Sequence, residues 1–177
     1  MNRRLFLSFT TALSALGASI ALGPAEAAPL PNFTFPSIDG GMIDSADWIG
    51  HPVLVVNTAS LRDMQAMHED LGPDGLIVLA VPSNDFNQEL DDARKVKEYC
   101  AVQYAITLPV TDIVHVARND VHPFYAWVRD QTGFVPSWNF GKVLISPEGE
   151  ILGTWGSVTK PDARPILGAI RPYLSPS

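Results

Sequence analysis

Residues 53–82 read VLVVNTASLRDMQAMHEDLGPDGLIVLAVP, and they carry the strongest secondary-structure pattern in the chain. Its two ends, Val53–Val56 and Gly75–Val81, are continuous apolar runs rich in β-branched residues, a pattern typical of strands covered on both faces of a sheet. Between them, Arg62–Leu71 carries apolar side chains at helical spacing and predicts a short helix. Two buried strands joined by a helix form a βαβ unit, so we expect the two strands to run parallel.

The rest of the chain predicts further strands and helices around this unit. Prolines and the Asp39-Gly40-Gly41 turn mark the lead-in before residue 53. The expected elements that follow are a helix at Asn87–Tyr104, a short strand at Leu108–Val110, a helix at His122–Asp130, a hairpin of Lys142–Ser146 and Ile151–Trp155, and a closing helix at Pro161–Leu174. This order favours an α/β, thioredoxin-like fold with a central mixed sheet flanked by helices, in one domain spanning residues 28–177.

Composition and charge narrow the class of protein. The chain has 177 residues, 46% of them hydrophobic and 18% charged, which indicates a globular domain with a substantial core. Twelve basic against nineteen acidic residues give a formal charge of -7, the wrong sign for holding phosphate backbones, so we expect no nucleic-acid partner. Cys100 is the single cysteine and the four histidines lack metal-ligand spacing, so the sequence predicts no intramolecular disulfide and no metal site.

The amino terminus has the layout of an export signal. Arg3 and Arg4 precede the apolar run Leu5–Leu22, and the small-residue stretch Ala25-Glu26-Ala27 follows. The paired arginines resemble those of a twin-arginine signal. We therefore expect residues 1–27 to be removed, the mature chain to be periplasmic, and no stable membrane insertion after cleavage. The alternative is an uncleaved membrane anchor.

Four segments, taken in chain order, resemble the glutathione peroxidase family. They are Val55–Ser60, Gly75–Glu89, His122–Tyr125, and Trp138–Phe140 with Lys142–Leu144. The resemblance extends from about Phe33 to Leu174. It implies a thioredoxin-like fold, hydroperoxide reduction in the response to oxidative stress, glutathione or thioredoxin as the reductant, and no bound cofactor. The short passage at residues 133–137 is similar to that of the smaller bacterial members, which are monomeric, so we expect a monomer.

The resemblance also implies the site residues. In the family, a cysteine or selenocysteine at the start of the first helix attacks the peroxide, because a helix amino terminus favours the thiolate. Gln88, Trp138 and Asn139 match the family residues that donate hydrogen bonds around that sulfur. The peroxidatic residue has no match, because the chain continues from Ser60 as Leu61-Arg62-Asp63, and neither a gapped nor an ungapped alignment places a thiol there. The ungapped alignment places Arg62 there, and its guanidinium cannot act as a nucleophile.

The sequence leaves two alternatives open. Cys100 lies close to where thioredoxin-dependent members carry a resolving cysteine, or it is a buried small apolar side chain. The chain as a whole is either a hydroperoxide-reducing enzyme impaired by the absence of the segment with the peroxidatic cysteine, or a non-catalytic thioredoxin-like module. Such a module would bind a thiol, lipid or protein partner without turnover.

Overall fold

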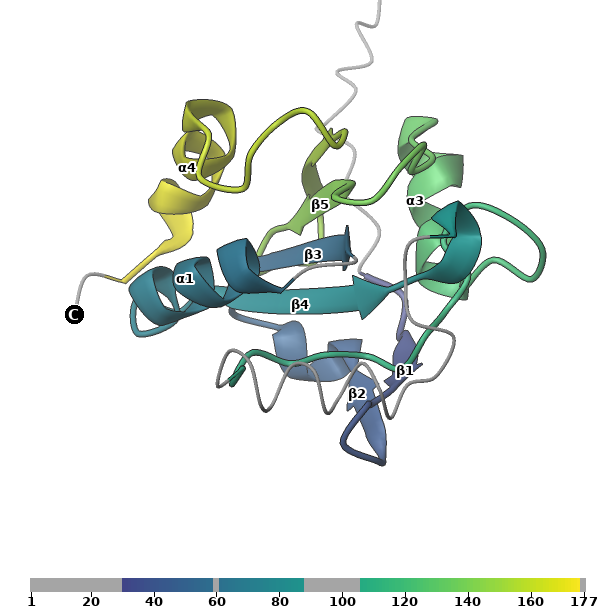
Figure 1. Cartoon of the computed structure of the whole chain (residues 1–177). Helices are drawn as coiled ribbons and strands as arrows, with labels where there is room; N and C mark the ends of the chain where they lie inside the picture. Colours follow the sequence, from purple (N-terminus) through teal and green to yellow (C-terminus); the bar gives the residue numbers. More distant parts are fainter. Residues whose placement is uncertain (1–29, 59–60, 88–105, 176–177) are drawn as a thin grey trace, which may run out of the picture.

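A four-stranded mixed sheet forms the centre of the molecule (Figure 1). The computed structural model of the chain describes residues 30–58, 61–87 and 106–175. The strands are β3 (Val53–Thr58), β4 (Ile77–Pro82), β5 (Lys142–Ile145) and β6 (Ile151–Trp155), in the order β4-β3-β5-β6. β3 runs parallel to β4 and antiparallel to β5, and β6 returns antiparallel to β5. The predicted βαβ unit and the predicted hairpin are both confirmed.

Successive side chains of a strand point to opposite faces of the sheet, and this alternation divides the core into two layers. Every residue of β3 is buried. Leu54 and Val56 contribute to the cluster on one face of the sheet, whereas Val53 and Val55 contribute to the cluster on the other. Because both faces are covered, a strand in this position has to be apolar at every residue, which is the pattern seen in the sequence.

Helices cover both faces of the sheet. α1 (Arg62–Leu71) and α4 (Arg164–Ile170) pack on one face through Met64, Ile166 and their neighbours. α3 (Pro123–Thr132) packs on the other through Phe124 and Val128. In Figure 1, α1 runs beside β4, and α3 and α4 lie on either side of β5. This arrangement confirms the mixed sheet flanked by helices, and the helix expected at Arg62–Leu71 has those bounds.

A small hairpin precedes the sheet. β1 (Thr34–Pro36) pairs antiparallel with β2 (Met42–Asp44), and a 3-10 turn, η1 (Ser45–Trp48), follows. Gly40 and Gly41 in the connecting turn have φ of 91° and 79°, a backbone region that favours glycine. The turn was expected from the sequence, but the two short strands beside it were not.

The strand expected at Leu108–Val110 is wrong. Only a single bridge forms there, between Val110 and Ala80. The reason is a contact that is distant in sequence: the backbone N–H groups of Thr107 and Leu108 both donate to Oε1 of Gln65 on α1, at 3.0 and 3.2 Å. Because Pro109 has no N–H, this segment has too few donors left to extend a ladder.

The closing helix is shorter than expected. Residues 161–163 precede it, α4 spans Arg164–Ile170, and the chain then tightens into a 3-10 turn, η3 (Arg171–Tyr173). Pro165 occupies the first turn of α4, where its missing N–H costs nothing, whereas Pro172 cannot donate within a continuing α-helix.

The remaining expected helices have different outcomes. The helix expected at His122–Asp130 is confirmed as α3, with His122 as its N-cap and Gly133, at φ 74°, ending it. The helix expected at Asn87–Tyr104 lies outside the described residues, apart from Asn87, which ends the 3-10 turn η2 (Asn84–Phe86). Within the described residues, no helix is both long enough and apolar enough to cross a membrane.

Candidate functional site

Asn57, near the carboxyl end of β3, fixes the turn that leads into β5. Its backbone N–H donates to the carbonyl of Gly141 at 3.1 Å, and its carbonyl accepts from the N–H of Phe140 at 2.6 Å. Its side-chain Nδ2 donates to the carbonyl of Trp138 at 3.2 Å. Because β5 is antiparallel to β3, these contacts hold residues 138–141 at the edge where β3 ends.

The same turn has little steric freedom. A Cβ at Gly141 would lie 2.6 Å from Oδ1 of Asn57, so only glycine fits beside that side chain. Phe140 has φ 67°, a left-handed conformation that is uncommon for a non-glycine residue. The close approach of residues 138–141 to β3 thus depends on glycine at position 141 and on the left-handed backbone conformation of Phe140.

The turn presents two of the predicted site residues in different environments. Asn139 is fully buried, whereas the side chain of Trp138 is 46% exposed. The indole of Trp138 packs against Phe86 of η2, with ring centroids 5.8 Å apart. η2 follows β4, so the parallel β3 and β4 deliver Asn57 and Phe86 to one edge of the sheet. Gln88 and Cys100, the other residues singled out in the sequence, lie outside the described residues.

The start of α1 faces the same edge, because α1 follows β3. Its N-cap is Leu61, whose side chain has no hydrogen-bond acceptor, and its first residue is the exposed Arg62. Cys100 is the only cysteine in the sequence, so the first turn of α1 contains no thiol. The N–H groups of that turn could stabilise a thiolate, but the chain supplies none there.

Lys142 holds the turn at residues 138–141 by a hydrogen bond from its side chain. No role for this residue was predicted from the sequence. Its side chain is fully buried at the start of β5. Nζ donates to the carbonyls of Phe140 at 2.6 Å, of Gly156 at 3.4 Å and of Thr159. Burial lowers the pKa of this ammonium to about 8. The only signal in the sequence is a lysine at the start of an otherwise apolar strand.

Asp85 is a second buried charged group that sequence reasoning missed. Its carboxylate accepts from the backbone N–H groups of Val116, Ala117 and Arg118 at 2.8, 2.7 and 3.2 Å, and from Nδ1 of His115 at 2.6 Å. Burial alone would raise its pKa, but these hydrogen bonds outweigh burial and lower it. Asp85 therefore fastens residues 115–118 to the end of β4, beside Phe86.

Comparison with known proteins identifies the family. The family model described as glutathione peroxidase matches residues 30–129. The chain belongs to the glutathione peroxidase family. It is 30% identical over 149 residues to glutathione peroxidase 7 of Bos taurus, covering 78% of this chain and 80% of that protein. It is 29% identical over 148 residues to the hydroperoxy fatty acid reductase gpx1 of Synechocystis sp., covering 73% of this chain and 88% of that protein.

Solved structures agree with this assignment. The crystal structure of Trgpx in its apo form matches with a TM-score of 0.60 and 29% identity, covering 78% of this chain and 93% of that one. A thioredoxin-family thiol:disulfide interchange protein from Chlorobium tepidum matches with a TM-score of 0.59 at 20% identity, covering 84% of this chain and 99% of that one. The second match concerns the fold alone, and together they confirm the predicted thioredoxin-like fold.

Proposed function

We propose that this chain is a glutathione peroxidase-type thiol peroxidase in which hydroperoxide reduction is impaired, because the segment that carries the peroxidatic cysteine is absent after Ser60. One observation supports this most strongly. Asn57, Phe86 and the Trp138–Asn139 turn lie together where β3 ends, yet the α1 terminus beside them contains Leu61 and Arg62 and no thiol.

The chemistry shows what the missing group would have to do. A thiolate attacks one peroxide oxygen, the O–O bond breaks, the sulfur becomes a sulfenic acid, and the other oxygen leaves as an alcohol or water after taking a proton. Two thiols of a reductant then return the sulfenic acid to the thiol and form a disulfide and water. We assign the indole N–H of Trp138 and the amides of Asn139 and Gln88 as donors that would stabilise the sulfur anion and the leaving oxygen.

Family membership implies a hydroperoxide substrate and a thiol reductant. Both glutathione and thioredoxin fit the proposal. Cys100 would serve as a resolving thiol only in a chain that first forms a sulfenic acid elsewhere, because the resolving step forms a disulfide from that acid. We also propose that the protein is monomeric and acts in the periplasm.

A second candidate is a non-catalytic module that binds a thiol, lipid or protein partner. The observation in its favour is at the same end of β3, where Trp138 presents a partly exposed indole that packs against Phe86. This indole could contact a partner whether or not a thiol is present. Exposed aromatic side chains held in place by packing are common anchors of binding sites.

Restoring the nucleophile separates the two candidates. The unmodified chain and its Cys100→Ser variant should consume hydrogen peroxide equally slowly in the presence of glutathione or thioredoxin with its reductase. Insertion of the family's cysteine-containing segment between Leu61 and Arg62 should produce turnover. The matched control carries the same insertion with serine in place of the cysteine, and it should stay inactive.

Two results would contradict the proposal. Turnover by the unmodified chain that survives Cys100→Ser would mean that the chain has not lost its nucleophile. An inserted segment that folds, as judged by circular dichroism, and still gives no turnover would favour the binding module instead.

A further inference from the structure

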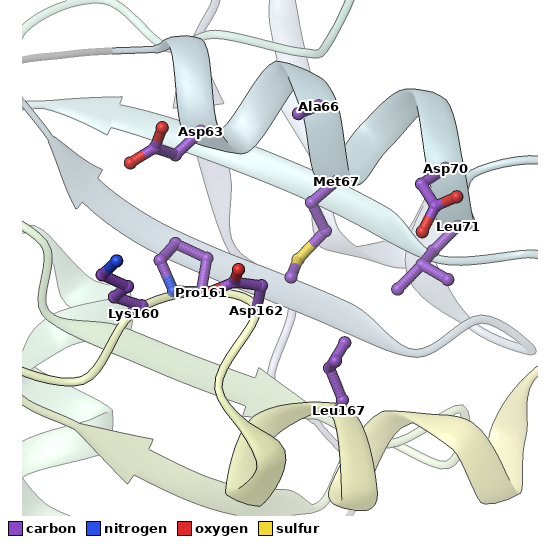
Figure 2. Close-up of a pocket in the computed structure, with 9 residues that line it drawn as sticks. All are labelled: Asp63, Ala66, Met67, Asp70, Leu71, Lys160, Pro161, Asp162 and Leu167. Atoms are coloured by element: carbon purple, nitrogen blue, oxygen red, sulfur yellow. The ribbon is translucent and has the colours of Figure 1, made fainter.

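A groove lies between α1 and the segment that leads into α4 (Figure 2). We call it the α1–α4 groove, and its walls include Asp63, Met67, Asp70, Asp162 and Leu167. Its volume is about 410 Å³, which lies in the range of about 300–1,000 Å³ typical of ligand sites. None of the residues discussed in the candidate functional site lines it, so it is a separate feature of the surface.

The wall on α1 has a regular pattern. Asp63 and Asp70 are two turns apart on one side of the helix, about 10 Å along its axis. Met67 lies between them, so the wall presents an acidic, an apolar and an acidic side chain in succession. Figure 2 shows Asp162 and Leu167 facing Met67 from the opposite wall. The middle of the groove is therefore apolar, and carboxylates stand at both ends and on the far side.

The carboxylates are not neutralised within the fold. Asp63, Asp70 and Asp162 are exposed and take part in no hydrogen bond or ion pair between side chains of the described residues. Lys160 is the one cation among the described residues that line the groove, and it lies at the Asp63 end. The site thus has a negative charge and an open apolar floor, since Leu71 and Leu167 are only partly buried against the core.

We propose that the α1–α4 groove binds a basic amphipathic helix of a partner protein, with lysine or arginine residues two turns apart and an apolar residue between them. A partner helix lying alongside α1 can place two basic residues at the same two-turn spacing as Asp63 and Asp70. Pairing of each basic residue with one of these carboxylates fixes how the partner helix is aligned along α1. Anionic ligands such as acidic lipids or phosphates meet the wrong charge. A second copy of the chain is also disfavoured, because the chain has a net charge of -7. The proposal does not depend on peroxidase activity.

A synthetic peptide tests this directly. The probe is a fluorescein-labelled, amidated helical 18-residue peptide of alanine and glutamine with lysine at positions 5 and 12 and leucine at 8 and 9. A shuffled peptide of the same composition, with lysine and leucine out of register, is the control. Fluorescence anisotropy at low ionic strength should show binding of the first peptide at least about tenfold tighter than of the second, because register supplies the specificity.

Matched variants of the full chain locate the binding surface. The triple variant Asp63→Asn, Asp70→Asn, Asp162→Asn should weaken binding of the probe about tenfold, since the three exposed carboxylates that attract its two lysines are lost. The control triple variant Asp47→Asn, Asp120→Asn, Glu148→Gln removes the same charge from exposed positions outside the groove and should leave binding almost unchanged. Leu167→Ser should weaken binding without changing its salt dependence. If the triple variant fails to fold, Asp70→Asn alone replaces it.

Several outcomes would overturn the proposal. Equal binding of the two peptides, or equal losses in the two triple variants, would reduce the interaction to general attraction between a cation and an acidic protein. A full chain that binds the probe more tightly after Arg3 and Arg4 are changed to serine would show that its own amino terminus occupies the groove. A dimer in sedimentation analysis that the probe dissociates would assign the groove to a second copy.

Discussion

Trp138 and Asn139 are neighbours in sequence and opposites in environment. The backbone hydrogen bonds from Asn57 hold Asn139 beneath the surface while the indole of Trp138 stays accessible and leans on Phe86. In the proposed function, this buried amide and this partly exposed indole would together hold the sulfur anion, because preorganised donors act most strongly where water is partly excluded.

This arrangement predicts the effect of removing either donor. In the chain with the inserted cysteine segment, Trp138→Phe or Asn139→Ala should slow peroxide reduction by about ten- to a thousandfold, the range for loss of one preorganised donor. Stopped-flow measurement of the first oxidation step isolates this effect from the reductant. Val135→Ala, at an exposed position just before the turn, is the matched control and should react normally. Restored turnover that is insensitive to both donors would refute their assignment.

The pKa of Lys142 depends on the burial of its side chain. Burial lowers its pKa to about 8, whereas in the unfolded chain it keeps an ordinary value near 10.4. Between these two values the unfolded state binds more protons than the folded state, so the free energy of unfolding should rise as the pH increases from about 8 to about 10.4. Below pH 8 both states are protonated and this contribution to pH dependence vanishes.

Urea unfolding at several pH values measures this increase in the free energy of unfolding. The Lys142→Met variant should show no such increase, because it lacks the titrating group. The difference between the two proteins removes the contribution of the other titrating groups. A ¹³C-lysine NMR titration with one resonance moving near pH 8 would identify the group directly. If all lysine resonances titrate above pH 10, the prediction is wrong.

At the scale of elements, one carboxylate joins two parts of the chain. Asp85 connects the end of β4 to residues 115–118, the segment that leads to α3. The Asp85→Asn variant replaces an acceptor with a group that also carries two donors, facing three backbone N–H groups. We expect a loss of about 2–3 kcal/mol in the free energy of unfolding, because the charge-assisted bonds disappear and buried donors lose their partner.

The same carboxylate predicts acid sensitivity. Because the folded-state pKa of Asp85 is lowered, its contribution is complete above the unfolded value of about 3.9 and is lost as the pH falls through the lower folded value. Thermal unfolding from pH 7 down to pH 2 should therefore show a shallower decline for Asp85→Asn than for the unmodified chain. Asp120→Asn, at an exposed position nearby, should reproduce the unmodified curve.

Elements also show what the sequence could and could not reveal. α1, α3 and the strands of the sheet were predictable, because their apolar residues recur at the spacing of a helix or fill a strand covered on both faces. The absence of a strand at Leu108–Val110 was not predictable, because the backbone N–H groups of Thr107 and Leu108 donate to Gln65, which lies 42 residues from Thr107 in the chain. Lys142 and Asp85 were missed for the same reason, since their roles come from partners distant in the chain.

The candidate site was predicted from the resemblance more than from residue patterns. Trp138 and Asn139 alone would fit an aromatic at a strand entry and a turn residue, and their assignment as donors stays a prediction. The structure adds the physical link that the sequence lacked, which is the pair of contacts between Asn57 and residues 138–140. Those contacts depend on the antiparallel register of β3 and β5, a long-range property that local spacing does not encode.

For the molecule as a whole, the proposed export depends on residues 1–27. The described fold starts at Leu30, and the two arginines, the apolar run and Ala25-Glu26-Ala27 all precede it in the sequence. If residues 1–27 direct export, the native protein should have its amino terminus at or near Ala28, which mass spectrometry of the purified protein measures. A full-length product in the cytoplasm would contradict export.

The route of export is tested by a change that preserves charge. Replacing Arg3 and Arg4 with lysines keeps the positive amino-terminal region that both export routes require, but it removes the paired guanidinium groups that mark the twin-arginine route. We therefore expect the precursor to accumulate in the cytoplasm, as followed by fractionation and mass spectrometry. Arg171→Lys, an exposed change in η3 at the far end of the chain, should leave export unaffected. Normal export of the double lysine variant would assign the protein to the general secretory route, because that route requires positive charge and an apolar run but not arginine itself.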